Sequence, residues 1–144
     1  MAVVDTGVAT GVADLAGQVA EHWRCDNTGC LPSTAAPTSP HGTEVASVVA
    51  ALDDGAGTTG VAPAATIVSY RVDGAGGIPI SYLHQALARI AVDGGVDVVN
   101  LSLGGSQWSR TEQVDVKRLL DAGKVVVAAA GNTSRSGRHR VRVL

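Results

Sequence analysis

The sequence predicts an α/β fold: a doubly wound, three-layer α/β/α domain with a mostly parallel sheet. One observation is that short apolar runs alternate along the chain with longer segments whose apolar residues recur at helical spacing. A second is that most of these segments end at glycine, which punctuates regular structure. Parallel strands joined by right-handed helical crossovers are the usual outcome of such alternation.

Four apolar runs are predicted to be strands. AVVD at residues 2–5 is a short β-branched run that stops before Gly7, and ATIVSYRV at residues 65–72 is a candidate buried strand. DVVNLSL at residues 97–103 and VVVAAA at residues 125–130 complete the set. The last run is apolar throughout, which is typical of a parallel strand buried on both faces.

Three helices are predicted between and after these strands. Residues 41–52 carry valines and a leucine at helical spacing. A second helix is predicted to start with Ser81 as its cap and to stop at Gly94. The third occupies residues 111–122 and closes at Gly123.

The segment that leads to the first helix contains both cysteines. Cys25 and Cys30 enclose DNTG, a sequence that turns easily, so a disulfide between them would close a small loop. Two free thiols are the alternative, because no second cysteine pair indicates an oxidising compartment. This pair and His22 supply too few ligands for a metal, so no metal site is predicted. Residues 26–40, rich in Pro, Ser, Thr and Gly, are predicted to form a surface loop ending at His41.

Composition and charge divide the chain into two parts. With 144 residues, 45% of them hydrophobic, the sequence describes one globular domain or a piece of one. Residues 1–132 hold all 13 acidic side chains, whereas residues 133–144 hold four arginines and no acid. We therefore expect a domain over residues 1–132 and a basic tail that is foreign to the fold. No apolar run approaches the roughly 20 residues of a membrane helix, so no membrane partner is expected. Nucleic acid is not an expected partner either, because 45% of the residues are hydrophobic and 17% are charged.

Polar residues follow the apolar runs at the points where the predicted strands end. Asp5, Asn100, Ser102 and Asn132 occupy these positions. Because ligands of open α/β sheets bind beyond the carboxyl ends of the strands, these residues are the first candidates for a functional site.

Five blocks of the sequence then show a family resemblance. They are VVDTGV at residues 3–8, HGTEVASVVAA at 41–51, GVAPAATIVSYRV at 60–72, VNLSLGG at 99–105 and VVVAAAGN at 125–132. Together and in this order they resemble the amino-terminal part of the catalytic domain of the subtilisin-like serine protease family. The resemblance implies a serine endopeptidase with an Asp-His-Ser triad.

Asp5 and His41 are the catalytic residues that the resemblance implies. A carboxylate at a strand end can accept the imidazole N–H and fix the tautomer, and a histidine at the start of a helix can act as general base. Taken alone, Asp5 is more simply a turn residue before Thr6 and Gly7. The other blocks favour the catalytic interpretation.

Two further elements of the site are implied by resemblance. The Asn132 side chain is placed to donate to a developing oxyanion, although Asn in a turn is the simpler reading. Ser102, Leu103 and Gly104 resemble the edge along which the family pairs an extended peptide or protein substrate by strand addition. The alternative is that these residues are only the end of a strand and the start of the following loop, without a role in binding.

The serine motif of the family, of the form GTSxAxP, does not occur in these 144 residues. Ser134 and Ser136 follow Asn132 too closely to be the nucleophile, and Ser39 is equally unsuited. We therefore expect a truncated fragment of a peptidase domain, inactive by itself.

Two other classes of function fit parts of the pattern. A pseudoprotease that binds peptide without cleaving it agrees with the missing serine. A doubly wound nucleotide-binding domain agrees with the alternation, but Gly7 and Gly11 do not have the spacing of a G-x-G-x-x-G loop.

The resemblance carries two more expectations. Calcium is common in the family, and Asp14 resembles a ligand position, but one carboxylate is far from the six to eight oxygens that calcium takes. No other cofactor is expected. Members of the family are secreted, which suggests the same for this protein, although we expect no signal peptide within these 144 residues.

Overall fold

In the computed structural model, residues 1–105 and 109–131 are described. Asn132 and the predicted basic tail lie outside them. The elements follow in the order β1 (Ala2–Asp5), a 3₁₀ turn (Ala13–Leu15), β2 (Val19–Asp26), β3 (Gly29–Pro32), α1 (His41–Ala50), β4 (Ile67–Arg71), α2 (Ile80–Val92), β5 (Val98–Leu101), α3 (Arg110–Asp121) and β6 (Val125–Ala128).

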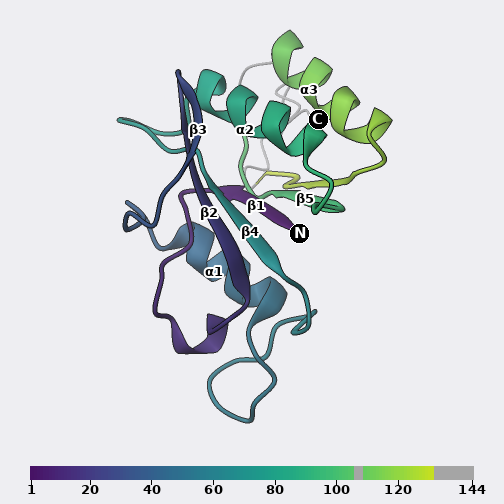
Figure 1. The fold of residues 1–144 in the computed structure, drawn as a ribbon. Coiled ribbons are helices and arrows are strands. Elements are labelled where there is room, and N and C mark those ends of the chain that lie inside the picture. Colours follow the sequence, from purple (N-terminus) through teal and green to yellow (C-terminus); the bar gives the residue numbers. More distant parts are fainter. Residues whose placement is uncertain (106–108, 132–144) are drawn as a thin grey trace, which may run out of the picture.

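The strands of the described residues form a sheet in the order β3-β2-β4-β1-β5-β6. Only β3, which pairs with β2, is antiparallel; the other pairings are parallel. Helix α1 covers one face of the sheet, and α2 and α3 cover the other (Figure 1). The predicted three-layer α/β/α class with a mostly parallel sheet is confirmed.

Strand β1 lies in the middle of this sheet, between β4 and β5. Its side chains alternate between the two faces: Val3 packs in a cluster with Ala50 of α1, whereas Val4 packs in the main core with Leu83 of α2. Both valines are fully buried. Because the strand is packed on both faces, it holds Asp5, the residue at its carboxyl end, in a fixed position.

The prediction that residues 125–130 form a fully buried strand is wrong. Strand β6 pairs with β5 and ends the described sheet, and Val125 and Val127 are 57% and 48% exposed. The alternate residues Val126 and Ala128 pack against the core below α3. The described residues therefore cover β6 on one face only.

The prediction that residues 26–40 form a loop throughout is wrong, because Gly29–Pro32 form strand β3. Strand β3 pairs with β2 as a hairpin in which Cys25 stands opposite Cys30, and a disulfide joins the two. Sequence patterns miss β2 because its sequence, VAEHWRCD, is mostly half-buried or exposed and has no clear alternation. The loop interpretation holds for residues 33–40.

The start of α2 also differs from the prediction. Pro79 precedes the helix and Ile80 begins it, so Ser81 is not the cap. The Ser81 hydroxyl instead donates to Oδ1 of Asn27 over 2.7 Å, which ties α2 to the β2–β3 hairpin. Helix α3 is capped by Ser109, whose hydroxyl accepts from the backbone N–H of Glu112. None of the helices in the described ranges is long and apolar enough to cross a membrane.

Candidate active site

Asp5 ends β1 and is only 1% exposed. Its Oδ1 accepts hydrogen bonds from the backbone N–H of Thr6 over 2.7 Å and from the Thr6 hydroxyl over 3.2 Å. These two donors fix the carboxylate in one orientation.

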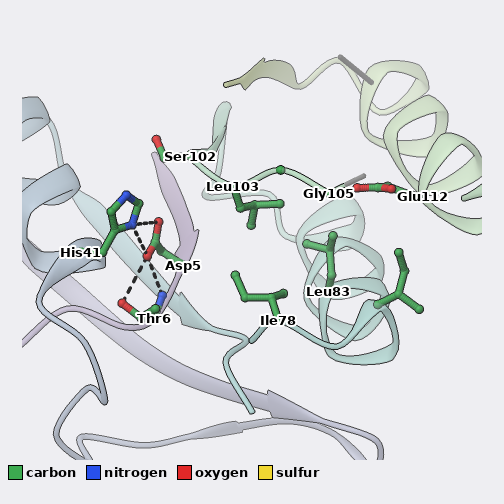
Figure 2. A pocket seen from close by; sticks show the side chains of 11 residues that line it. Asp5, Thr6, His41, Ile78, Leu83, Ser102, Leu103, Gly105 and Glu112 are labelled. Atoms are coloured by element: carbon green, nitrogen blue, oxygen red, sulfur yellow. Dashed lines mark hydrogen bonds and ion pairs between the residues drawn. The ribbon is translucent and has the colours of Figure 1, made fainter. Parts of the chain in front are cut away.

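His41 begins α1 and faces this carboxylate. Its Nδ1 lies 2.8 Å from Oδ1 and 3.0 Å from Oδ2 of Asp5 (Figure 2). A carboxylate at this distance accepts the Nδ1–H, so the neutral ring keeps Nε2 as its free basic nitrogen. Half of the His41 side chain is exposed, which leaves Nε2 accessible.

The environment raises the pKa of His41 above its ordinary value. The hydrogen bond to Asp5 contributes most, followed by the negative charge of Asp5, while partial burial opposes the shift and the charge of Glu44 adds to it. The imidazole is thus held as a stronger base than a free histidine, and its protonated form is stabilised.

The start of α1 is fastened to the loop after β1. The single proton of the Thr6 hydroxyl is shared between Asp5 Oδ1 and the carbonyl oxygen of Ser39, which lies 3.1 Å away, and the hydroxyl oxygen accepts from the N–H of Gly42 over 3.1 Å. A Cβ on Gly42 would lie 2.5 Å from the carbonyl oxygen of Gly7, so only glycine permits this approach. The close approach brings His41 within hydrogen-bonding distance of Asp5.

The loop that leads into α1 is held from the other side by β4. Arg71 Nε donates to Asp73 over 2.6 Å, and its Nη1 donates to the carbonyl of Ala36 over 2.7 Å. The Thr38 hydroxyl donates to the same Asp73 carboxylate. Burial alone would raise the pKa of Asp73, but the hydrogen bonds from Arg71 and Thr38 outweigh it and lower the pKa.

A pocket of about 360 Å³ opens beside the Asp5 and His41 pair. The predicted substrate residues Ser102, Leu103 and Gly104 line it, so the structure brings them together with the pair, as Figure 2 shows. Asn100 donates to Ser102 over 2.8 Å and stands behind the pocket rather than in its lining. The expected oxyanion donor, Asn132, lies outside the described residues.

Comparison with known proteins identifies the family. The Peptidase_S8 family, the subtilases, matches residues 1–142. This chain belongs to the subtilase family. Among curated relatives, thermitase of Thermoactinomyces vulgaris is 36% identical over 138 residues, which are 94% of this chain and 48% of thermitase. Subtilisin E of Bacillus subtilis (strain 168) is 34% identical over 141 residues, covering 95% of this chain and 35% of the relative.

Solved structures agree with the assignment. The structure titled S41 Psychrophilic Protease has a TM-score of 0.83 and 31% identity, covering 94% of this chain and 46% of that one. Sphericase has a TM-score of 0.74 and 32% identity, with 94% and 46% coverage. This subtilase chain thus spans between about a third and a half of the length of these relatives. Because the chain belongs to the subtilase family, the alternative of a nucleotide-binding domain is dropped.

Sequence reasoning missed several lining residues of the subtilase pocket, among them Ile78, Leu83 and Glu112. Ile78 lies in the segment before α2, Leu83 is on the inward face of α2, and Glu112 is in the first turn of α3. Leu83 is a buried residue of α2, but a helical pattern in the sequence does not say that the buried face also lines a pocket. No sequence signal marks Glu112.

The carboxylate of Asp14, the residue that resembles a calcium ligand, is bound to Thr58. Its Oδ2 accepts from the backbone N–H of Thr58 over 3.0 Å and from the Thr58 hydroxyl over 3.1 Å. Within residues 1–105 and 109–131, no group of three or more His, Cys, Asp or Glu side chains could hold a metal. Calcium takes six to eight oxygens, and one committed carboxylate does not supply them.

Proposed function

We propose that Asp5 and His41 are the catalytic aspartate and the general base of a subtilisin-like serine endopeptidase. The observation that carries the proposal is the Nδ1 to Oδ1 contact of 2.8 Å at the mouth of a pocket lined by Ser102, Leu103 and Gly104. The family assignment supports the triad chemistry. The activity belongs to a polypeptide that also provides the serine, and we expect none from these 144 residues alone.

The geometry of the pair supports a defined proton path. His41 Nε2 accepts the proton of a serine hydroxyl as the oxygen attacks the scissile carbonyl carbon, and the ring becomes imidazolium. Asp5 keeps the Nδ1–H and stabilises this cation without taking its proton. The imidazolium then gives its proton to the leaving amine. An acyl-serine remains, and a water molecule activated by the same nitrogen hydrolyses it.

The substrate is proposed to be an extended peptide or protein segment. Ser102, Leu103 and Gly104 follow β5, and their backbone groups are suited to pair with an added strand. A Cβ on Gly104 would meet nothing within 4 Å, so the space above this segment is open. Asn132 is proposed to donate its side-chain amide to the oxyanion of the tetrahedral intermediate, a contribution of typically about 3 kcal/mol.

The proposal also covers calcium binding and the cellular location of the protein. Calcium binding stays a family expectation, and no catalytic step depends on it. The Cys25–Cys30 disulfide supports a secreted protein, because such bonds persist in oxidising compartments.

The proposal is tested with a serine-directed fluorophosphonate probe. Residues 1–131 are joined to the remaining, serine-containing part of subtilisin E, and labelling of this chimera is compared with labelling of the 144-residue chain. We expect the chimera to be labelled and to cleave peptide, His41→Ala and Asp5→Asn to abolish both, and the 144-residue chain to remain unlabelled. Labelling of the 144-residue chain at any serine would overturn the proposal, as would full activity in the His41→Ala chimera.

A further inference from the structure

The pocket beside His41 has a second carboxylate at its far end. Glu112 stands in the first turn of α3, and Figure 2 shows its side chain directed toward the segment that contains Leu103 and Gly105. Between His41 and Glu112 the wall is formed by apolar side chains, including Leu83 and Leu103. The pocket therefore runs from the reacting centre along an apolar wall to an acid.

The carboxylate of Glu112 has no cationic partner among the described residues. The other acid of this region, Asp115, is paired with His84 over 2.7 Å and with Arg118 over 3.3 Å. Glu112 is half-buried and makes no hydrogen bond or ion pair with residues 1–105 and 109–131. Burial, and then the charge of Asp115, raise its pKa. Its negative charge is thus held in the pocket wall with no cation of the described residues paired to it.

The helix cap does not account for this side chain. Ser109 and Glu112 have the spacing of a capping box, and the Ser109 hydroxyl accepts from the Glu112 N–H over 3.3 Å. The reciprocal bond, from the Ser109 N–H to the Glu112 carboxylate, is not formed in the structure. The dipole of α3 favours an acid in its first turn, but it does not require that the acid line the pocket.

We propose that Glu112 makes this site select a substrate residue with a long cationic side chain, lysine or arginine. The methylene stem lies along Leu83 and Leu103, and the ammonium or guanidinium group pairs with the Glu112 carboxylate. An aliphatic side chain of the same length fills the same space but buries the charge of Glu112 further without compensation. The inference rests on the proposed function, since it assumes that the pocket binds substrate.

The test measures peptide binding to the 144-residue chain by NMR titration at low ionic strength. Short alanine peptides carry lysine at each position in turn, and a matched series carries norleucine, which has the lysine stem without the amine. We expect one position at which lysine binds about five-fold tighter than norleucine, the effect of one partly exposed ion pair. Added salt reduces this preference.

Variants assign the preference to Glu112. Glu112→Gln removes the preference and leaves norleucine peptides bound as before, whereas Asp121→Asn, an exposed acid at the other end of α3, leaves the preference intact. Glu112→Lys should replace the preference for lysine peptides by a preference for glutamate peptides. Because this variant gains a new binding preference, it tests the inference even if Glu112→Gln perturbs the helix.

The outcomes separate the two levels of inference. Peptides that bind with no difference between lysine and norleucine, or a lysine preference that survives Glu112→Gln, overturn the role of Glu112 and leave the proposed substrate site standing. Binding of no peptide by the folded chain overturns the proposed substrate site, and the role of Glu112 with it.

Discussion

Arg71 and Asp73 form a nearly buried ion pair at the end of β4, with 2.6 Å between Nε and Oδ1 and side-chain exposures of 13% and 8%. The same guanidinium holds the carbonyl of Ala36, and Thr38 donates to the same carboxylate. The pair therefore fastens the loop that leads to His41, and its energy contributes to the stability of the site as well as the fold.

We predict that Arg71→Met destabilises the chain by about 3 kcal/mol, because it leaves the Asp73 charge buried without its partner. The measurement is the free energy of unfolding in urea. Lys117→Met is the matched control, since Lys117 pairs with Asp121 in an exposed position where the loss is at most about 1 kcal/mol. If both variants lose the same free energy of unfolding, the buried ion pair stabilises the fold no more than the exposed one does.

A second prediction concerns the protonation of His41 in the 144-residue chain. Its pKa is raised by the hydrogen bond to Asp5 and by the charge of Asp5, so Asp5→Asn should lower it toward the ordinary value. The measurement is an NMR titration of the histidine ring protons. His22 is the internal control, because burial lowers its pKa and the variant should leave it unchanged. A His41 pKa that ignores Asp5→Asn would contradict the pairing.

The raised pKa of His41 also sets a direction for stability against pH. The Asp5 interaction stabilises the fold fully below the unfolded-state pKa of about 6.5, and this part of the stability is lost as the pH rises through the higher folded-state pKa. Asp5→Asn should flatten this decline. Urea unfolding across that pH range, compared between the two proteins, measures the effect.

Much of the fold and the pair at its centre could be predicted from the sequence, because each depends on local pattern. The run before Asp5 and the helix after His41 carry their own apolar periodicity, and the family blocks align them. Strand β2 could not be predicted, since its half-exposed residues lack such periodicity. Glu112 could not be predicted either: its place in the pocket depends on how α3 lies beside the segment after β5, and no spacing within α3 encodes that.

The close approach of Gly42 to Gly7 gives a fourth prediction. Alanine is the better helix former, so Gly42→Ala in an unconstrained helix would stabilise α1. Here the added Cβ would lie 2.5 Å from the Gly7 carbonyl oxygen and 3.1 Å from Asp5 Cβ, and the backbone at Gly7, directly after β1, cannot yield cheaply. We expect a loss of about 2 kcal/mol and a His41 pKa nearer its ordinary value, because the helix start moves away from Asp5.

The control for Gly42→Ala is Gly94→Ala, where a Cβ would meet nothing within 4 Å. Its effect on urea unfolding should be small, and the NMR titration of His41 should not change. An unchanged His41 titration in Gly42→Ala would mean that the close approach does not position the imidazole.

The disulfide gives the last prediction. Cys25 and Cys30 close a short loop between paired strands, and a crosslink of that span contributes about 2 kcal/mol by restricting the unfolded chain. The double variant Cys25→Ala, Cys30→Ala should lose that amount in urea unfolding. Reduction of the unmodified chain should reproduce the loss, and the same reductant should leave the double variant unchanged. If reduction does not shift the unfolding midpoint, the hairpin is held instead by its strand pairing and by the bond from Ser81 to Asn27.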